Sequence, residues 1–335
     1  MRKIASLLTR RQAIVPVGFA IGIWFGAAAV QGIDWTDIRA QISHASVGAM
    51  VGAFALVLLS SWVRAFRWRL LFVGHPVTTR RLFLVENAAL GLNNVSPVRL
   101  LDEPAILAML TLRDRIPGPL VMATLVMSRM QDLGVTLLFA AVALTVEPTL
   151  SARVVPALVA GGAFIVVFGG LLNIERLARH FSVVRRIPGI DTYGQAVQTL
   201  LERKLRLTWT VLLTGAYWLV LGPMTYVLAH GMGVELSMLQ AAILVLGAIT
   251  FATAVPGLPA ALGTFELAVV ELAAIWDVPH SSALGFGLIL HVVIFLPPVV
   301  TGLLVLPHEG LSFLGKPKAE HLETPQDTLT GQERN

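Results

Sequence analysis

The chain of 335 residues contains no cysteine, so disulfide bridges, thiolate zinc sites and iron–sulfur clusters are excluded. Charged residues are also scarce, at 13% against roughly 25% in a soluble domain. Apolar residues make up 56% of the chain, and the mean hydropathy is +0.76. One water-facing shell could not hide that much apolar surface. This composition excludes a soluble enzyme, a disordered chain and a coiled coil, and it indicates an integral membrane protein.

Sequence motifs of enzyme chemistry are lacking as well. The chain has no glycine-rich phosphate loop, nucleophile elbow or HExxH motif, and its eight histidines show no zinc-ligand spacing. We therefore expect no enzymatic activity, no metal and no cofactor. The net charge of +5 comes from basic clusters between apolar runs. Such clusters are typical of membrane topology and of contact with anionic lipid headgroups, so nucleic acid is not an expected partner.

Six apolar runs are long enough to cross a hydrocarbon core of about 30 Å. They cover residues 14–30, 45–62, 119–146, 152–172, 207–229 and 282–306. The first could be a signal peptide with small residues at 27–29, but its length favours a retained helix. Basic clusters at 2–11, 64–81 and 176–206 predict that both termini are cytoplasmic and that the 32–44 loop is external. We expect residues 1–306 to form one membrane domain and residues 307–335 a disordered polar tail.

Two further apolar segments are interrupted by polar residues, proline or glycine. Residues 82–112 contain Asn94, Pro97, Arg99 and an Asp102-Glu103 pair, and residues 238–276 contain the stretch 256–263 with two prolines and two glycines. A broken backbone is tolerated at membrane depth only inside protein or beside a water-filled cavity. We interpret both segments as re-entrant pairs of half-helices, the first entering from the cytoplasm and the second from outside.

The order span, broken pair, span occurs over residues 45–146 and again, inverted, over 207–306. Inverted repeats whose broken helices meet near the midplane are a design of membrane transporters. The predicted fold class is therefore an all-α, polytopic helical membrane protein. It has about six full spans and two re-entrant broken-helix pairs in an inverted repeat, with the two breaks close together.

Ionisable groups at membrane depth cost roughly 2.5–3.5 kcal/mol each on insertion scales, so they usually pair or line a pathway. Arg129 and Asp132 are three residues apart and share a helix face. They could form a structural ion pair, or Arg129 could bind an anionic ligand while Asp132 orients it. Arg99 could likewise clamp a phosphate, unless Asp102 and Glu103 neutralise it.

Glu266 follows Gly263 at the start of the helix after the second break. It could cap that helix, or it could act as a gate or proton-linked carboxylate facing a cavity. His291 lies in the last predicted span. There, a hydrogen-bonded interior residue is favoured over a proton relay.

Three motifs in order resemble the lysylphosphatidylglycerol synthase transmembrane-region family, whose members are also called flippase-like domain proteins. They are Gly91-x-x-Asn94-x-x-Pro97-x-Arg99 with Asp102-Glu103, then Arg129-x-x-Asp132, and then Pro256-x-x-Pro259 through Gly263-x-x-Glu266. The resemblance covers residues 10–306 and implies a lipid-translocating membrane domain. The candidate substrate-binding residues are Asn94, Arg99, Asp102, Glu103, Arg129, Asp132, Pro259, Gly263 and Glu266.

The resemblance implies a flippase that moves an anionic or glycosylated lipid between leaflets, with phospholipid, polyprenyl-linked and hopanoid-type lipids as candidates. The alternative is an accessory protein that presents lipid to a separate transferase or glycosyltransferase without moving it. A membrane-embedded transferase ranks third, because no nucleophile–base arrangement occurs and the short tail leaves no room for a soluble aminoacyl-transferase domain. The expected partners are a lipid with an anionic headgroup and a lipid-modifying enzyme, and the expected location is the bacterial cytoplasmic (inner) membrane.

Overall fold

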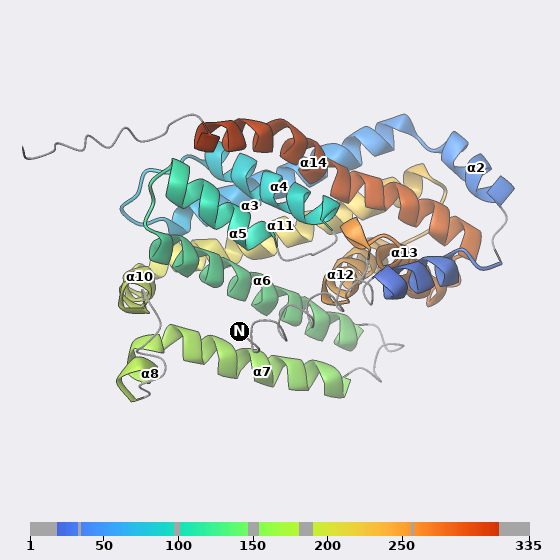
Figure 1. Ribbon diagram of the computed structural model, residues 1–335. Coiled ribbons are helices and arrows are strands. Elements are labelled where there is room, and N and C mark those ends of the chain that lie inside the picture. The colour runs from blue at the N-terminus through green and yellow to red at the C-terminus, as the bar shows by residue number, and fades with distance from the viewer. Residues whose placement is uncertain are drawn as a thin grey trace, which may run out of the picture.

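The computed structural model describes residues 19–32, 35–96, 101–146, 154–180, 190–255 and 258–314, and in these residues it contains helices and no strand. The all-α prediction is therefore confirmed (Figure 1). After a first helix over Phe19–Ala29, the elements are α2 (Trp35–His44), α3 (Val47–Leu71), α4 (Thr79–Val95), α5 (Asp102–Ala108), the π-helical turn η1 (Met109–Arg113), α6 (Gly118–Val146), α7 (Val154–Leu172), α8 (Ile174–His180), α10 (Ile190–Glu202), α11 (Lys204–Gly231), α12 (Met238–Ala254), the 3-10 turn η3 (Pro259–Ala261), α13 (Thr264–Ala274) and α14 (His280–Leu314).

Four of these helices, α3, α6, α11 and α14, are long and apolar enough to cross a bilayer. They coincide with four of the six predicted spans. The predicted span 152–172 corresponds to α7, which has 19 residues, and the predicted span 14–30 is described from Phe19 onward as a shorter apolar helix. The protein is thus a polytopic helical membrane protein, although the predicted number of full spans is not matched in the described residues.

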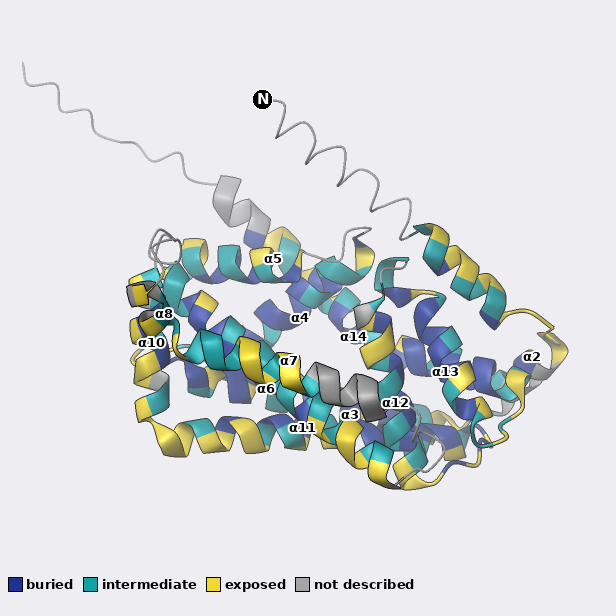
Figure 2. Ribbon diagram, turned by 90° about the horizontal axis from the view of Figure 1, so that it is seen from below, coloured by how far each residue is buried: buried dark blue, intermediate teal, exposed yellow. Residues whose placement is uncertain are grey.

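Large apolar side chains cover the outer surface of the bundle. Val166 is 75% exposed and Leu303 is 68% exposed, and in Figure 2 such exposed residues lie on outward-facing helix surfaces while the buried ones lie inside. Exposed apolar surface of this extent would promote association in water. It is what a helix surface in contact with lipid acyl chains requires.

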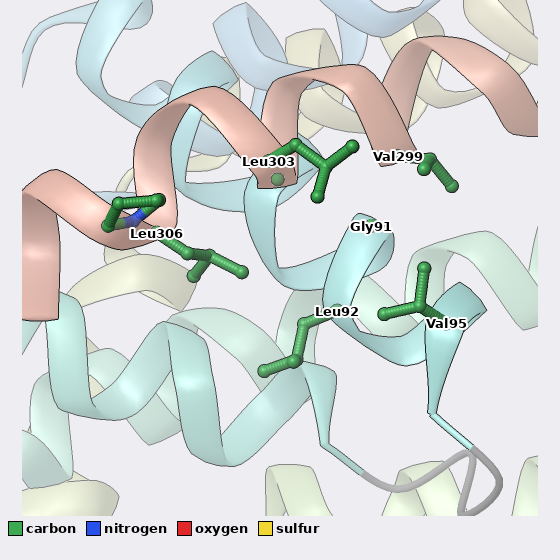
Figure 3. Close-up of a pocket in the computed structure, with 8 residues that line it drawn as sticks. Gly91, Leu92, Val95, Val299, Leu303 and Leu306 are labelled. Atoms are coloured by element: carbon green, nitrogen blue, oxygen red, sulfur yellow. The ribbon is translucent and has the colours of Figure 1, made fainter.

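Close backbone approach at glycine joins the main helix pairs. At the α4–α14 crossing, a Cβ on Gly91 would lie 2.1 Å from the carbonyl oxygen of Pro298, and a Cβ on Gly302 would lie 3.3 Å from Gly91 Cα. Small residues allow helices in a membrane to pack at this distance. Beside this crossing lies an apolar groove of about 170 Å³, lined by Leu92 and Val95 of α4 and by α14 residues that include Leu303 (Figure 3).

Both predicted breaks occur. α4 ends at Val95 and α5 begins at Asp102, while α12 ends at Ala254 and α13 begins at Thr264 after η3. The predicted breaking residues Pro97, Pro256 and Gly257 lie outside the described residues. Because η3 packs directly against α4, the two interrupted segments are neighbours in space.

The helical boundaries differ from the predicted ones in three main places. The 32–44 loop contains the helix α2, α3 continues nine residues beyond the predicted end at 62, to Leu71, and the last helix continues eight residues beyond the predicted end at 306, to Leu314. The first helix packs into the bundle, since a Cβ on Gly263 would lie 2.3 Å from the oxygen of Gly22 and 2.7 Å from the nitrogen of Gly26. The spacing of Gly22 and Gly26 is that of a small-xxx-small packing motif.

Candidate functional site

Ionisable side chains from four helices meet in the interior of the bundle, and we call this set the charged seam. α3 contributes two arginines, α4 one glutamate, α5 two carboxylates, and α6 an arginine and an aspartate. The members are Arg64, Arg67, Glu86, Asp102, Glu103, Arg129 and Asp132. α11 supplies hydroxyl groups to the same region.

Arg67 is the most enclosed member of the charged seam, with a side chain that is 0% exposed. Its guanidinium donates to Asp132 Oδ1 at 2.9 Å and to Thr214 Oγ1 at 3.1 Å, and it also donates to the hydroxyl and the carbonyl oxygen of Ser128. The hydroxyl of Tyr217 donates to the same Asp132 oxygen at 2.6 Å. Both Nη atoms of Arg67 are thus bonded to protein groups, as a buried charge requires, whereas its Nε makes no hydrogen bond in the described residues.

Arg129 is held differently, by the first turn of α5. Its Nη2 lies 2.9 Å from Asp102 Oδ2, and its Nε donates to Glu103 Oε1 at 3.2 Å. The Arg129 side chain is 37% exposed and that of Glu103 is 44% exposed, whereas Asp102 is buried. Arg129 is therefore an accessible cation at the first break, with one deep and one shallow carboxylate partner.

The predicted ion pair between Arg129 and Asp132 is wrong. The two residues lie on the same helix, but Arg129 pairs with the acids of α5 and Asp132 pairs with Arg67 of α3. Spacing of three residues places two side chains on one helix face without deciding which neighbouring helix each one meets. Glu103 and Asp102 thus orient Arg129, and Asp132 does not.

The third pair of the charged seam joins Arg64 Nε to Glu86 Oε1 at 3.1 Å. The second oxygen of Glu86 is buried and makes no hydrogen bond in the part of the chain that the structure describes. A buried carboxylate oxygen normally has a donor. Among the other predicted site residues of this region, Asn94 is half-buried on the last turn of α4, and Arg99 lies outside the described residues.

The remaining predicted site residues meet at the second break. Glu266 Oε2 accepts a hydrogen bond from the backbone nitrogen of Gly263 at 2.8 Å, so Glu266 caps α13. Its other oxygen lies 2.6 Å from His291 Nδ1 on α14. Pro259 begins η3, four residues before Gly263. Capping and pairing therefore use both oxygens of one buried carboxylate.

Sequence reasoning missed Arg64 and Arg67, because it assigned them to the cytoplasmic basic cluster. A signal was present in their spacing. Ala53, Val57 and Ser60 are buried along one face of α3, and Arg64 and Arg67 continue that face at helical intervals of three and four. Tyr217 gave no comparable signal, since it lies in an ordinary apolar span.

A separate ionic cluster, the Glu309 clamp, joins the beginning of α4, the end of η1 and the end of α14. Glu309 lies 2.7 Å from both Arg81 Nη1 and Arg113 Nη1, and Arg81 Nε also lies 2.8 Å from Asp114. These bonds fix α14 to the base of the first interrupted segment.

Comparison with protein families supplies the assignment. The model of the family described as Lysylphosphatidylglycerol synthase TM region matches residues 15–302. The chain belongs to this family. The match includes every member of the charged seam as well as Glu266 and His291. The charged seam and the Glu266–His291 contact therefore both lie inside the lysylphosphatidylglycerol synthase TM region. A comparison with curated proteins gave no match.

Proposed function

We propose that this lysylphosphatidylglycerol synthase TM-region protein is a flippase that moves a lipid with an anionic or glycosylated headgroup between leaflets. Its setting would be the bacterial cytoplasmic membrane, with both termini in the cytoplasm. The observation that carries the proposal is Arg129, a half-exposed guanidinium held at a helix break inside a membrane protein. Membership of a family named for lipid modification makes lipid the expected ligand.

The geometry around Arg129 allows one partner to be exchanged. Glu103 is its more exposed partner and meets it through a single oxygen at 3.2 Å. A lipid phosphate can form two parallel hydrogen bonds with a guanidinium, and it can therefore replace Glu103 while Asp102 keeps the arginine in place. The displaced Glu103 has access to solvent, which lowers the cost of separating it from Arg129.

Arg67 differs from Arg129 in how accessible it is to a lipid. It is fully buried and both of its Nη atoms are hydrogen-bonded, so a lipid would have to break several hydrogen bonds to reach it. We assign Arg67 and Asp132 to holding α3, α6 and α11 together and Arg129 to contact with the headgroup.

The two interrupted segments fit the proposed path. We interpret α4–α5 and α12–α13 as the re-entrant pairs of an inverted repeat, and the contact between η3 and α4 supports a meeting of the two breaks. In transporters of this design, the substrate binds where the broken helices meet. The acyl chains would stay in the bilayer, where the apolar groove beside Gly91 offers a surface for them.

The test is a leaflet-resolved lipid assay in proteoliposomes, run with fluorescent phospholipid and with a glycosylated polyprenyl lipid. Arg129→Gln should abolish translocation and weaken lipid binding, and Arg129→Lys should retain part of both because it keeps the charge without the fork. Arg69→Gln is the matched control, since Arg69 is an exposed arginine outside the charged seam. Translocation at the parent rate in Arg129→Gln would refute the role of Arg129. Binding without translocation in the parent protein would instead identify the accessory protein that presents lipid to a transferase.

A further inference from the structure

We propose that Glu266 and His291 form a proton-binding site that controls the opening of the second helix break. Glu266 Oε1 and His291 Nδ1 are 2.6 Å apart, and both residues are buried. Nδ1 makes no hydrogen bond of good geometry in the described residues, so the packing of the two side chains sets this short contact. Its position links it to the break, because the same carboxylate bonds Gly263.

A nitrogen and an oxygen at this distance attract each other only when one proton is shared between them. Loss of one proton leaves a carboxylate beside a neutral imidazole, with a net charge of −1 whichever ring nitrogen keeps the remaining proton. Gain of a second proton leaves an acid facing an imidazolium, with a net charge of +1. Either change places an uncompensated buried charge at the break, and admitting water to it relieves the cost.

The pair is isolated from other groups that could take over its proton. In the described residues, the first helix, α12 and η3 carry no ionisable side chain. Groups on the other packed elements are engaged elsewhere: Arg64, Arg67 and Glu86 in the charged seam; Arg81, Arg113 and Glu309 in the Glu309 clamp. His280 contacts the backbone oxygen of Ala29, and the exposed groups are Arg39, Arg69, Arg80, Lys204, Arg206, His230, Glu271 and His308.

Aromatic rings keep water from the pair in the observed state. The His291 ring lies 4.4 Å from the ring of Phe295 and 5.3 Å from that of Phe265, measured between centroids. Proton exchange therefore requires movement of α13 or α14. Histidine side chains in general change protonation between about pH 5 and 8, which sets the pH range of the test.

Opening would spread from Glu266 through the turn at Gly263. This glycine has φ of +81°, and its backbone rests on Gly22 and Gly26 of the first helix. Release of the Glu266 carboxylate removes the cap of α13 and loosens that contact. The consequence for lipid movement rests on the proposed function, because the opened break is where the headgroup would pass.

The proton site can be tested without any lipid assay. The chain has no cysteine, so Leu262→Cys places a single thiol on a 47%-exposed residue beside Gly263. Maleimide labelling is measured from pH 5.5 to 8.0, over which the charged fraction of an ordinary histidine falls from about nine-tenths to about three per cent. Each rate is divided by that of the same cysteine with Glu266→Gln, which keeps a capping side chain and removes the charge, so the titration of the thiol cancels.

The relative labelling rate should rise several-fold with pH in the parent, and in His308→Gln, which removes an exposed histidine of the same helix. It should stay flat in His291→Arg, where the cation cannot lose its proton. If Glu266→Gln does not fold, His291→Gln serves as the reference. A flat parent profile, or the same rise in His291→Arg, overturns the proposal.

A translocation assay over the same pH range separates this inference from the proposed function. Translocation should depend on pH in the parent and lose that dependence in His291→Arg. If the parent moves no lipid at any pH, the proposed function fails, while the labelling profile still decides whether the proton site exists.

Discussion

The charged seam and the Glu266–His291 pair both place ionisable side chains in the interior of a membrane protein, but they accommodate the charge in different ways. The seam spreads seven ionisable residues over four helices, and each arginine has at least one carboxylate partner. The pair has two members, enclosed by aromatic rings. An arginine keeps its charge at every physiological pH, whereas a histidine can lose its charge. The seam is thus a permanent feature of the interior, and the pair is one whose charge can change.

The largest effect is expected within the seam, at Arg67. Arg67→Ala leaves Asp132, whose side chain is only 16% exposed, without its cation and should lower the free energy of unfolding by about 3–5 kcal/mol. Thermal unfolding in detergent measures this change. The double variant Arg67→Met with Asp132→Leu should regain much of the loss, because replacing both charges removes the unpaired one. A single variant as stable as the parent would contradict the structural role of Arg67 and its distinction from a ligand-binding Arg129.

The second largest loss of stability is expected at Gly263, whose backbone nitrogen bonds Glu266. Gly263→Ala adds a Cβ that would lie 2.3 Å from Gly22 O at a φ of +81°, and we expect destabilisation of about 2–4 kcal/mol from strain and overpacking. Gly233 is a matched control, because its φ is +71° and a Cβ there meets nothing within 4 Å. Gly233→Ala should therefore cost only about 1–2 kcal/mol for the backbone conformation. Equal melting temperatures for the two variants would show that the first helix does not press on this turn.

A smaller effect is expected at the accessible end of the seam. Glu103→Gln removes a partly exposed ion pair and should change stability by about 0–1 kcal/mol. Asp102→Asn should cost more, about 1–3 kcal/mol, because Asp102 is buried against Arg129. Thermal unfolding of both variants shows which of the two carboxylates contributes more to stability. The reverse order would contradict the assignment of Glu103 as the partner that a headgroup displaces.

The smallest perturbation tests from which side each break is reached. Trp35→Cys and Arg176→Cys replace exposed residues in a chain without native cysteine, so neither should alter stability measurably. A membrane-impermeant maleimide should label residue 35 in intact cells, and it should label residue 176 only after the membrane is permeabilised. Labelling of residue 176 from outside would invert the topology and with it the predicted entry side of each broken pair.

Sequence predicted the parts of this fold that depend on local composition. The long apolar runs became α3, α6, α11 and α14, and the interruptions near Asn94 and Pro259 became the two breaks. Partner choice could not be predicted in the same way. Whether Arg129 meets Asp132 or Asp102 depends on how α5 and α3 are placed around α6, and that placement is set by contacts such as those at Gly91 and Gly263. The contact between Glu266 and His291 could likewise not be predicted from their spacing in the sequence, because it depends on how α13 lies against α14.

The helix α14 joins the Glu266–His291 pair to the ionic cluster around Glu309. Its 35 residues would measure about 52 Å as a straight helix, well beyond the thickness of a hydrocarbon core. His291 lies on the part of α14 before Pro297 and Pro298, and Glu309 lies on the part after them, which the Glu309 clamp fixes. Two consecutive prolines lack the backbone N–H groups that stiffen a helix. We therefore expect α14 to bend at Pro297 and Pro298, so that the part carrying His291 moves relative to the part fixed by the Glu309 clamp.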